Sequence, residues 1–127
     1  MSDPIQFIIN ESPTSLIKLA EHISSIRQSG VYICTNDPEQ SQKVSQVLWS
    51  HPKDRFIPNS VQLDAPESVI LIHNLNPPPN RQLIINLSNR LLSRVNIEWI
   101  TQDITLARQR YQHWRRLGHT IHTLKHS

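Results

Sequence analysis

Short apolar runs alternate with amphipathic helical patterns along the first half of this chain, and this alternation constrains the fold more than any other feature. An apolar run at 5–9 precedes a helical pattern at 13–29, and a second run at 31–35 precedes a second helical pattern at 37–49. This order favours parallel strands joined by right-handed crossovers. Runs that are apolar at every position are typical of strands covered on both faces. The pattern therefore predicts a three-layer α/β domain.

The second half of the chain adds further strand patterns. They lie at residues 69–73, 82–86, 95–100 and 119–124. The connection between the first two contains three successive prolines at 77–79, which cannot continue a strand, and it predicts a hairpin with a stiff, protruding loop. We therefore expect one domain over residues 1–127, with a mainly parallel or mixed sheet flanked by helices.

Glycine is scarce, and its positions are informative. The chain has only two glycines, Gly30 and Gly118. Both follow predicted helices, where a C-terminal cap uses the conformation that glycine tolerates best. Neither belongs to a glycine cluster of the kind that cradles phosphate between a strand and a helix. A nucleotide-dependent enzyme is therefore disfavoured.

The single cysteine and the hydropathy pattern bear on the cellular compartment. Cys34 lies in the apolar run VYIC, which predicts a buried structural thiol, and one cysteine excludes an internal disulfide framework. Such cysteine usage suits a reducing cytosol. No apolar run approaches the ~20 residues that span a bilayer, and the N-terminus lacks a signal-peptide pattern. We expect a soluble, cytoplasmic protein.

Side chains suited to catalysis or metal binding are present but scattered. His119 and His122 fall on opposite faces of a predicted strand, so they cannot chelate one ion together. The acidic residues fall at predicted turns and strand ends, where solvated carboxylates are ordinary; they include Asp54, Asp64, Glu67 and Glu98. We expect no metal site, no cofactor and no enzymatic activity of the chain by itself, and fold analogy alone does not support a hydrolase.

Residues 102–118 form the most distinctive pattern, one amphipathic helix closed by a glycine. Its apolar residues recur at three- and four-residue steps and share one face; they are Ile104, Ala107, Tyr111 and Trp114. The neighbouring face displays Arg108, Gln112 and Arg115. Arginine can grip a carboxylate with two parallel hydrogen bonds, and an aromatic ring beside it offers an apolar wall. This helix is therefore a candidate site for a peptide that ends in acidic and apolar residues.

The net charge of +3 is concentrated near the C-terminus. Residues 101–127 contain five arginines and lysines and a single acidic residue, Asp103, whereas the remaining chain is close to neutral. A basic region attracts either an acidic protein segment or nucleic acid. Direct binding of single-stranded nucleic acid is thus the alternative hypothesis. Phosphate-binding surfaces usually extend over many basic groups, whereas this one is compact.

A loop at residues 50–58 follows Trp49 and contains Phe56 and Ile57. Large apolar side chains in a loop often tuck under it as a small satellite cluster. The alternative is an exposed patch that a partner covers.

Two stretches resemble the chi subunit family of bacterial DNA polymerase III. They are 48–58, LWSHPKDRFIP, and 106–111, LARQRY, which continues to Arg115 and Gly118. The similarity extends over nearly the whole chain and is loose between Asn59 and Val95. It implies an α/β fold like that of nucleotide-binding domains, without a nucleotide site.

The resemblance also implies partners. Chi-family proteins are accessory subunits that pair with the psi subunit, which tethers them to the clamp loader. They also bind the acidic, phenylalanine-ended tail of single-stranded DNA-binding protein, so their link to DNA is mostly indirect. On this chain, the implied psi-binding patch is Trp49, Pro52, Phe56 and Pro58, and a helicase-like protein is a further candidate partner for it.

The implied tail-binding site lies on the arginine helix. By this resemblance, Arg108 pairs with the terminal carboxylate, Arg115 meets upstream acidic residues, and Tyr111 lines a phenylalanine pocket with Ile97 in its apolar wall. Gln112 stands where the family can have a lysine, which implies the loss of one charge contact.

Overall fold

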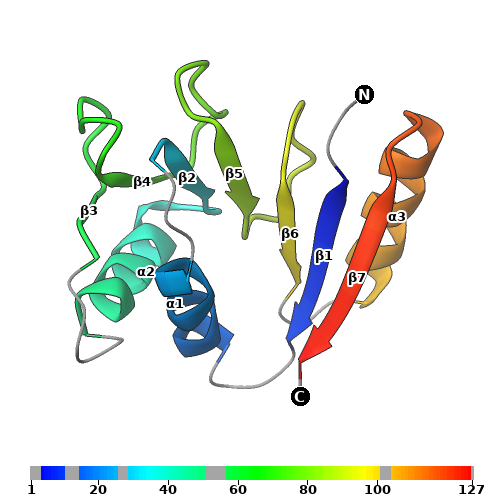
Figure 1. Cartoon of the computed structure of the whole chain (residues 1–127), viewed down its shortest axis with the longest axis horizontal. Helices are drawn as coiled ribbons and strands as arrows, with labels where there is room; N and C mark the ends of the chain where they lie inside the picture. Colours follow the sequence, from blue (N-terminus) through cyan, green and yellow to red (C-terminus); the bar gives the residue numbers. More distant parts are fainter. Residues whose placement is uncertain (1–3, 11–14, 26–28, 51–56, 101–103, 127) are drawn as a thin grey trace.

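The computed structural model describes residues 4–10, 15–25, 29–50, 57–100 and 104–126, which form a seven-stranded parallel sheet with three helices (Figure 1). In chain order the elements are β1 (Ile5–Asn10), α1 (Ser15–Ser25), β2 (Val31–Cys34), α2 (Pro38–Ser50), β3 (Asn59–Ser60), β4 (Ile70–His73), β5 (Leu83–Asn86), β6 (Ile97–Ile100), α3 (Ile104–Arg116) and β7 (Ile121–His126). The predicted α/β domain is confirmed. None of the described helices combines the length and apolarity needed to cross a bilayer.

The strands follow the order β3-β4-β2-β5-β6-β1-β7 across the sheet. The predicted hairpin of β4 and β5 is therefore wrong, because β2 lies between these two strands and is parallel to both. Tyr32 of β2 pairs with Leu71 on one side and with Ile84 on the other. The proline-containing connection carries the chain across β2, and the Tyr32 hydroxyl donates to the carbonyl of Leu75 at 2.5 Å. Both strands gain burial on two faces by this arrangement, as their uninterrupted apolar sequences favour.

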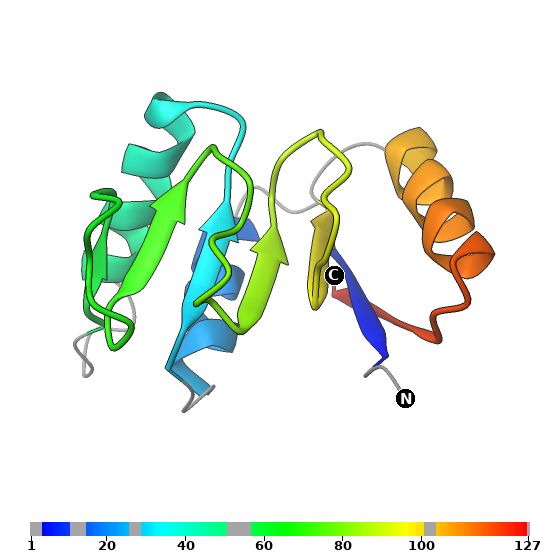
Figure 2. The ribbon, with the colours of Figure 1, turned by 90° about the horizontal axis from the view of Figure 1, so that it is seen from above.

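Successive residues of each strand point to opposite faces of the sheet, so the sheet carries two separate apolar clusters. The cluster on the side of α1 and α2 includes Ile8, Leu19, Ile33, Val44 and Ile97. The cluster on the side of α3 includes Phe7, Tyr32, Cys34, Ile84 and Trp114. The predicted burial of Cys34 is confirmed. Figures 1 and 2 show that α3 lies at the β1–β7 end of the sheet, while α1 and α2 lie toward the other end.

Gly118 ends α3, as the sequence predicted. Its φ of 86° lies in the left-handed region that favours glycine. The Gly118 amide donates to the Arg115 carbonyl at 3.0 Å, and the His119 amide donates to the Trp114 carbonyl at 3.1 Å. These two bonds form a Schellman motif, which satisfies carbonyls at the helix end and turns the chain toward β7.

A buried ion pair joins α3 to the sheet. Arg110 Nη1 lies 3.4 Å from Glu98 Oε1 on β6, and both side chains are almost fully buried. The carboxylate also accepts hydrogen bonds from Asn86 Nδ2 at 2.8 Å and from Trp114 Nε1 at 3.4 Å. Burial raises the pKa of the Glu98 carboxyl above its usual value, and these partners oppose the rise. The ion pair therefore fixes one face of α3 toward the sheet.

The sequence predicted a solvated carboxylate at Glu98, and the structure contradicts this prediction. Glu98 lies on the sheet face that α3 covers, where the buried Arg110 compensates its charge. Asp64 and Glu67 are exposed, as predicted, and Asp54 lies outside the described residues.

We expect Arg110→Met to destabilise the protein by about 3 kcal/mol, because it leaves the Glu98 carboxylate buried without its countercharge. The folded-state pKa of Glu98 exceeds its unfolded value, so a protonated Glu98 relieves this penalty. The loss of stability should therefore be smaller at about pH 5 than at about pH 8. Urea denaturation at both pH values measures it. The double variant Glu98→Gln/Arg110→Met should recover much of the loss, and an equal loss at both pH values would contradict the account.

Candidate functional site

The exposed face of α3 carries the side chains that the sequence singled out. Ala107 and Trp114 are buried against the sheet, whereas Arg108 and Arg115 are exposed. Tyr111 lies between these two faces and is 38% exposed. Its position follows from the helical period, which places it beside both the buried stripe and the arginines.

The ring of Tyr111 has an aromatic and a cationic neighbour. It makes an edge-on contact with Phe7 of β1, with ring centroids 6.0 Å apart and an interplanar angle of 85°. The Arg115 guanidinium lies 5.9 Å from the centroid of the same ring, a cation–π distance. These contacts place an aromatic wall at the edge of the space between α3 and the sheet.

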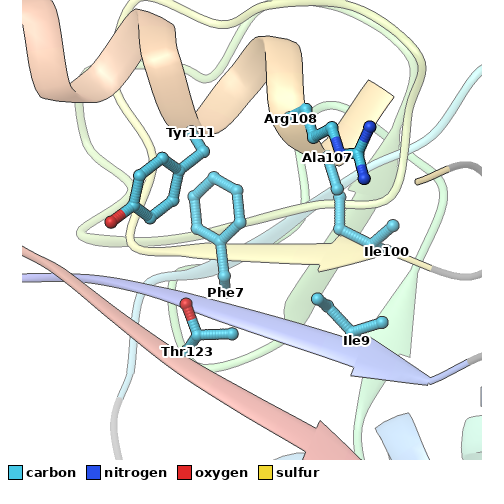
Figure 3. Close-up of a pocket in the computed structure, with 7 residues that line it drawn as sticks. All are labelled: Phe7, Ile9, Ile100, Ala107, Arg108, Tyr111 and Thr123. Carbon is cyan, nitrogen blue, oxygen red and sulfur yellow. The ribbon is translucent and has the colours of Figure 1, made fainter. Parts of the chain in front are cut away.

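A cavity of about 190 Å³ lies between α3 and three strands (Figure 3). Its strand-side lining consists of Phe7, Ile9, Ile100 and Thr123, and its helix-side lining consists of Ala107, Arg108 and Tyr111. The walls are almost wholly apolar, and Arg108 is the one cationic residue among the residues that line the cavity. An apolar cavity of about 150 Å³ can hold a benzene ring, so this one has room for a phenyl group.

Two small side chains leave this space open. Ala107 contributes only a methyl group on the helix side, and Thr123 contributes a short side chain on the strand side (Figure 3). The register pairs Thr123 with Phe7 and Ile9 with Ile100, so lining residues from distant parts of the chain lie side by side.

The structure brings together some of the predicted site residues and separates one. Arg108 and Tyr111 line the cavity, and Arg115 contacts the Tyr111 ring. Gln112 is exposed on the same helix. Ile97 is buried in the cluster on the side of α1, across the sheet from the cavity. Ile97 thus cannot contribute to this wall.

Sequence reasoning missed the four lining residues that lie on strands: Phe7, Ile9, Ile100 and Thr123. The period of two along β6 offered a signal for one of them, since Ile100 and Ile97 must face opposite sides of the sheet. The others depend on the parallel pairing of β1 with β7, which no local pattern encodes.

The second predicted patch lies at the other end of the sheet. Trp49, in the last turn of α2, is 53% exposed, and Pro58 is also exposed. Ile57 is 7% exposed, so this loop residue is tucked inward. Pro52 and Phe56 lie outside the described residues.

The start of α2 follows the carboxyl end of β2, where open α/β sheets commonly bind ligands. Here the Asp37 carboxylate accepts a hydrogen bond from the Gln40 amide at 2.8 Å, and the Ser41 amide donates to the Asp37 carbonyl at 3.1 Å. A phosphate group at this helix terminus would have to displace the aspartate. Within the described ranges, no three His, Cys, Asp or Glu side chains gather as ligands for a metal ion.

These features define an α/β domain with an apolar cavity whose lining includes an arginine. The sequence model of the family described as DNA polymerase III chi subunit, HolC, matches residues 4–122. The chain therefore belongs to the DNA polymerase III chi subunit family, which supports an accessory role in DNA replication. A comparison with curated proteins finds no match.

The size of the cavity predicts that it binds a phenyl ring, and Arg108 in its lining predicts a carboxylate next to that ring. We expect N-acetylphenylalanine, at millimolar concentration, to shift the NMR signals of Tyr111 and Thr123. Ala107→Leu should abolish these shifts, because the larger side chain fills the cavity, while helix propensity stays similar. The melting temperature is the control for folding. If N-acetylphenylalanine causes the same NMR shifts in the Ala107→Leu variant, it binds outside the cavity.

Proposed function

We propose that this chain bridges the clamp loader to single-stranded DNA-binding protein during replication, as a non-catalytic cytoplasmic subunit of the polymerase III holoenzyme. One surface binds the psi subunit, and the cavity beside α3 binds the acidic, phenylalanine-ended tail of single-stranded DNA-binding protein. Membership of the chi family supports the assembly, and the geometry beside α3 supports the second contact.

The observation that carries the tail-binding proposal is the apolar cavity with Arg108 in its lining. A chain that ends in phenylalanine presents a phenyl ring and a terminal carboxylate within a few ångströms of each other. The cavity accepts the ring, and the Arg108 guanidinium pairs with the carboxylate through charge-assisted hydrogen bonds.

The remainder of α3 supports an acidic rather than a neutral peptide. Residues 104–127 contain no aspartate or glutamate. Arg115 is held against Tyr111 and remains exposed, so it is available to acidic residues upstream of the terminal phenylalanine. Gln112 adds no charge, and this surface therefore attracts the tail less strongly than one with a lysine at this position.

The alternative, direct binding of single-stranded DNA, gains less support from the structure. One of the C-terminal arginines, Arg110, is buried in its pair with Glu98 and cannot reach phosphate. A compact pair of cations beside an apolar cavity suits a carboxylate terminus better than an extended phosphate backbone.

The psi subunit, or a helicase-like protein in its place, binds the patch at Trp49 and Pro58. An exposed tryptophan at the end of a helix is the kind of side chain that concentrates binding energy at protein interfaces. Psi then links the chain to the clamp loader.

Calorimetry with an acidic peptide ending in phenylalanine tests the tail site. We expect a dissociation constant in the micromolar range, about −8 kcal/mol. Arg108→Ala should weaken binding at least about tenfold, because it removes a charge-assisted pair with the terminal carboxylate. Deletion of the terminal phenylalanine should abolish binding.

Matched controls separate the two hypotheses. Arg116→Ala removes an exposed charge of the same helix that does not line the cavity, so it should change the affinity by less than about threefold. A single-stranded oligonucleotide competes for a phosphate-binding surface but not for the phenyl cavity. No binding of the intact peptide at low salt would sink the tail-site assignment.

Trp49→Ala tests the second surface. We expect it to weaken the complex with psi by about 2 kcal/mol or more, since a large exposed aromatic side chain is lost from the interface. Co-purification and calorimetry measure the effect. The same variant should bind the tail peptide normally, and a normal psi complex would rule out a central role for Trp49.

A further inference from the structure

The strand β7 lies at one end of the sheet, and within the described residues only β1 pairs with it. Its outer edge therefore carries backbone groups that no strand in the described part of the chain pairs with (Figure 1). Such an edge is a template onto which an extended segment of another chain can add.

The hydrogen-bond pattern identifies the groups that face this edge. Ile5 pairs with Ile121, and the Ile5 amide donates to the Thr120 carbonyl at 2.9 Å. In a parallel ladder, alternate residues bond to opposite neighbours. The Thr120 carbonyl faces β1, so the amide and carbonyl groups of Ile121 and Thr123 face outward. The backbone of Lys125 continues this outward set.

The cavity lies beside this edge. Thr123, one of the outward-bonding residues of β7, also lines the cavity with Arg108 (Figure 3). A peptide whose last side chain enters the cavity therefore has its C-terminal end next to β7. The two arginines then set its direction.

Arg108 lies near the carboxyl ends of the strands, because the cavity that it lines also contains Ile9 and Ile100. Arg115 lies near the amino end of β7, because only a short turn separates the end of α3 from Ile121. A tail that passes Arg115 and ends at Arg108 therefore runs in the same direction as β7.

The lengths agree. At ~1.5 Å of rise per helical residue, Arg108 and Arg115 are separated by ~10 Å along α3. An extended chain covers this distance in about three residues, at ~3.3 Å each. The outward groups of Ile121 and Thr123 fall within the same span.

We propose that the acidic tail adds to the free edge of β7 as a parallel strand, with main-chain hydrogen bonds to Ile121 and Thr123 and its terminal side chain in the cavity. This inference rests on the proposed tail-binding function and assigns it a new structural basis. The bound sheet then has one strand more than the seven of the free protein.

The positive charge of the C-terminal region determines which kind of peptide binds to the free edge of β7. Residues 104–127 carry arginine, lysine and histidine without any acidic residue, so an acidic strand is attracted to β7. A second copy of this chain would instead bring an equally basic C-terminal region against it, and like charges repel. An acidic peptide is therefore favoured over self-association through β7.

A scan of N-methylated peptides tests the backbone contacts. Each upstream amide of the tail peptide is methylated in turn, and its affinity is measured by calorimetry. Parallel pairing predicts an alternating result: methylation weakens binding about tenfold or more at every second position and much less between them. Methylation effects without alternation would overturn the proposal.

Amide hydrogen exchange of the full-length protein, followed by NMR, gives a second test without any substitution. Peptide binding should slow exchange at Ile121 and Thr123, whose amides gain partners. The amides of His122 and Leu124 already bond to β1, so their exchange should change much less. Equal slowing at all four residues, or none, would also overturn the proposal.

The two hypotheses fail in different ways. If the unmodified peptide does not bind, both the tail-binding function and the strand addition are wrong. If the peptide binds with dependence on Arg108 and on its terminal phenylalanine, but neither alternation occurs, the function stands and the strand addition is wrong.

Discussion

The buried contact between Glu98 and Arg110 is the constraint on which the placement of α3 depends. A carboxylate inside the domain requires a countercharge, and the side chain that supplies it is on the helix that also displays Arg108 and Arg115. Arg110 further donates to the backbone carbonyls of Ser88 and Arg90, which ties the β5–β6 connection to the same helix. Burial of Arg110 fixes the rotation of α3, and that rotation exposes Arg108 and Arg115.

The parallel topology explains how this helix comes to cover a cavity. β1 lies between β6 and β7, so residues near the start of the chain pair with residues near its end. Phe7 and Thr123 consequently form one wall, which α3 covers as the crossover from β6 to β7. Ala107 is too small to fill the gap beneath the helix. The cavity is thus a product of long-range strand pairing and one small side chain.

Local sequence patterns predicted the helices and strands well, but they predicted less well which strands are neighbours in the sheet. The apolar runs and helical periods located most strands and all three helices, because periodicity is a local property of the sequence. The connection at 74–82 led to a wrong prediction of a hairpin, because a proline-containing segment suits a tight hairpin as well as a crossover above Tyr32.

Helical spacing grouped Arg108 with Tyr111. It could not reveal that Arg110, on the same helix, is buried and pairs with Glu98. That pairing requires knowledge of which face of β6 the helix covers. Without that knowledge, Ile97 was wrongly predicted to lie in the wall of the cavity beside α3.

The positions of the two proposed partner surfaces bear on how a small domain can bridge larger assemblies. Trp49 lies on α2, beside the β3–β4 end of the sheet, whereas Arg108 and the cavity lie at the β1–β7 end (Figure 1). The strands between them are paired throughout and buried on both faces, so they form a rigid spacer. Partners at opposite ends of such a sheet do not compete for the same surface. A bridge of this kind needs no conformational change: the fold itself keeps the two partners apart, and each can bind while the other is in place.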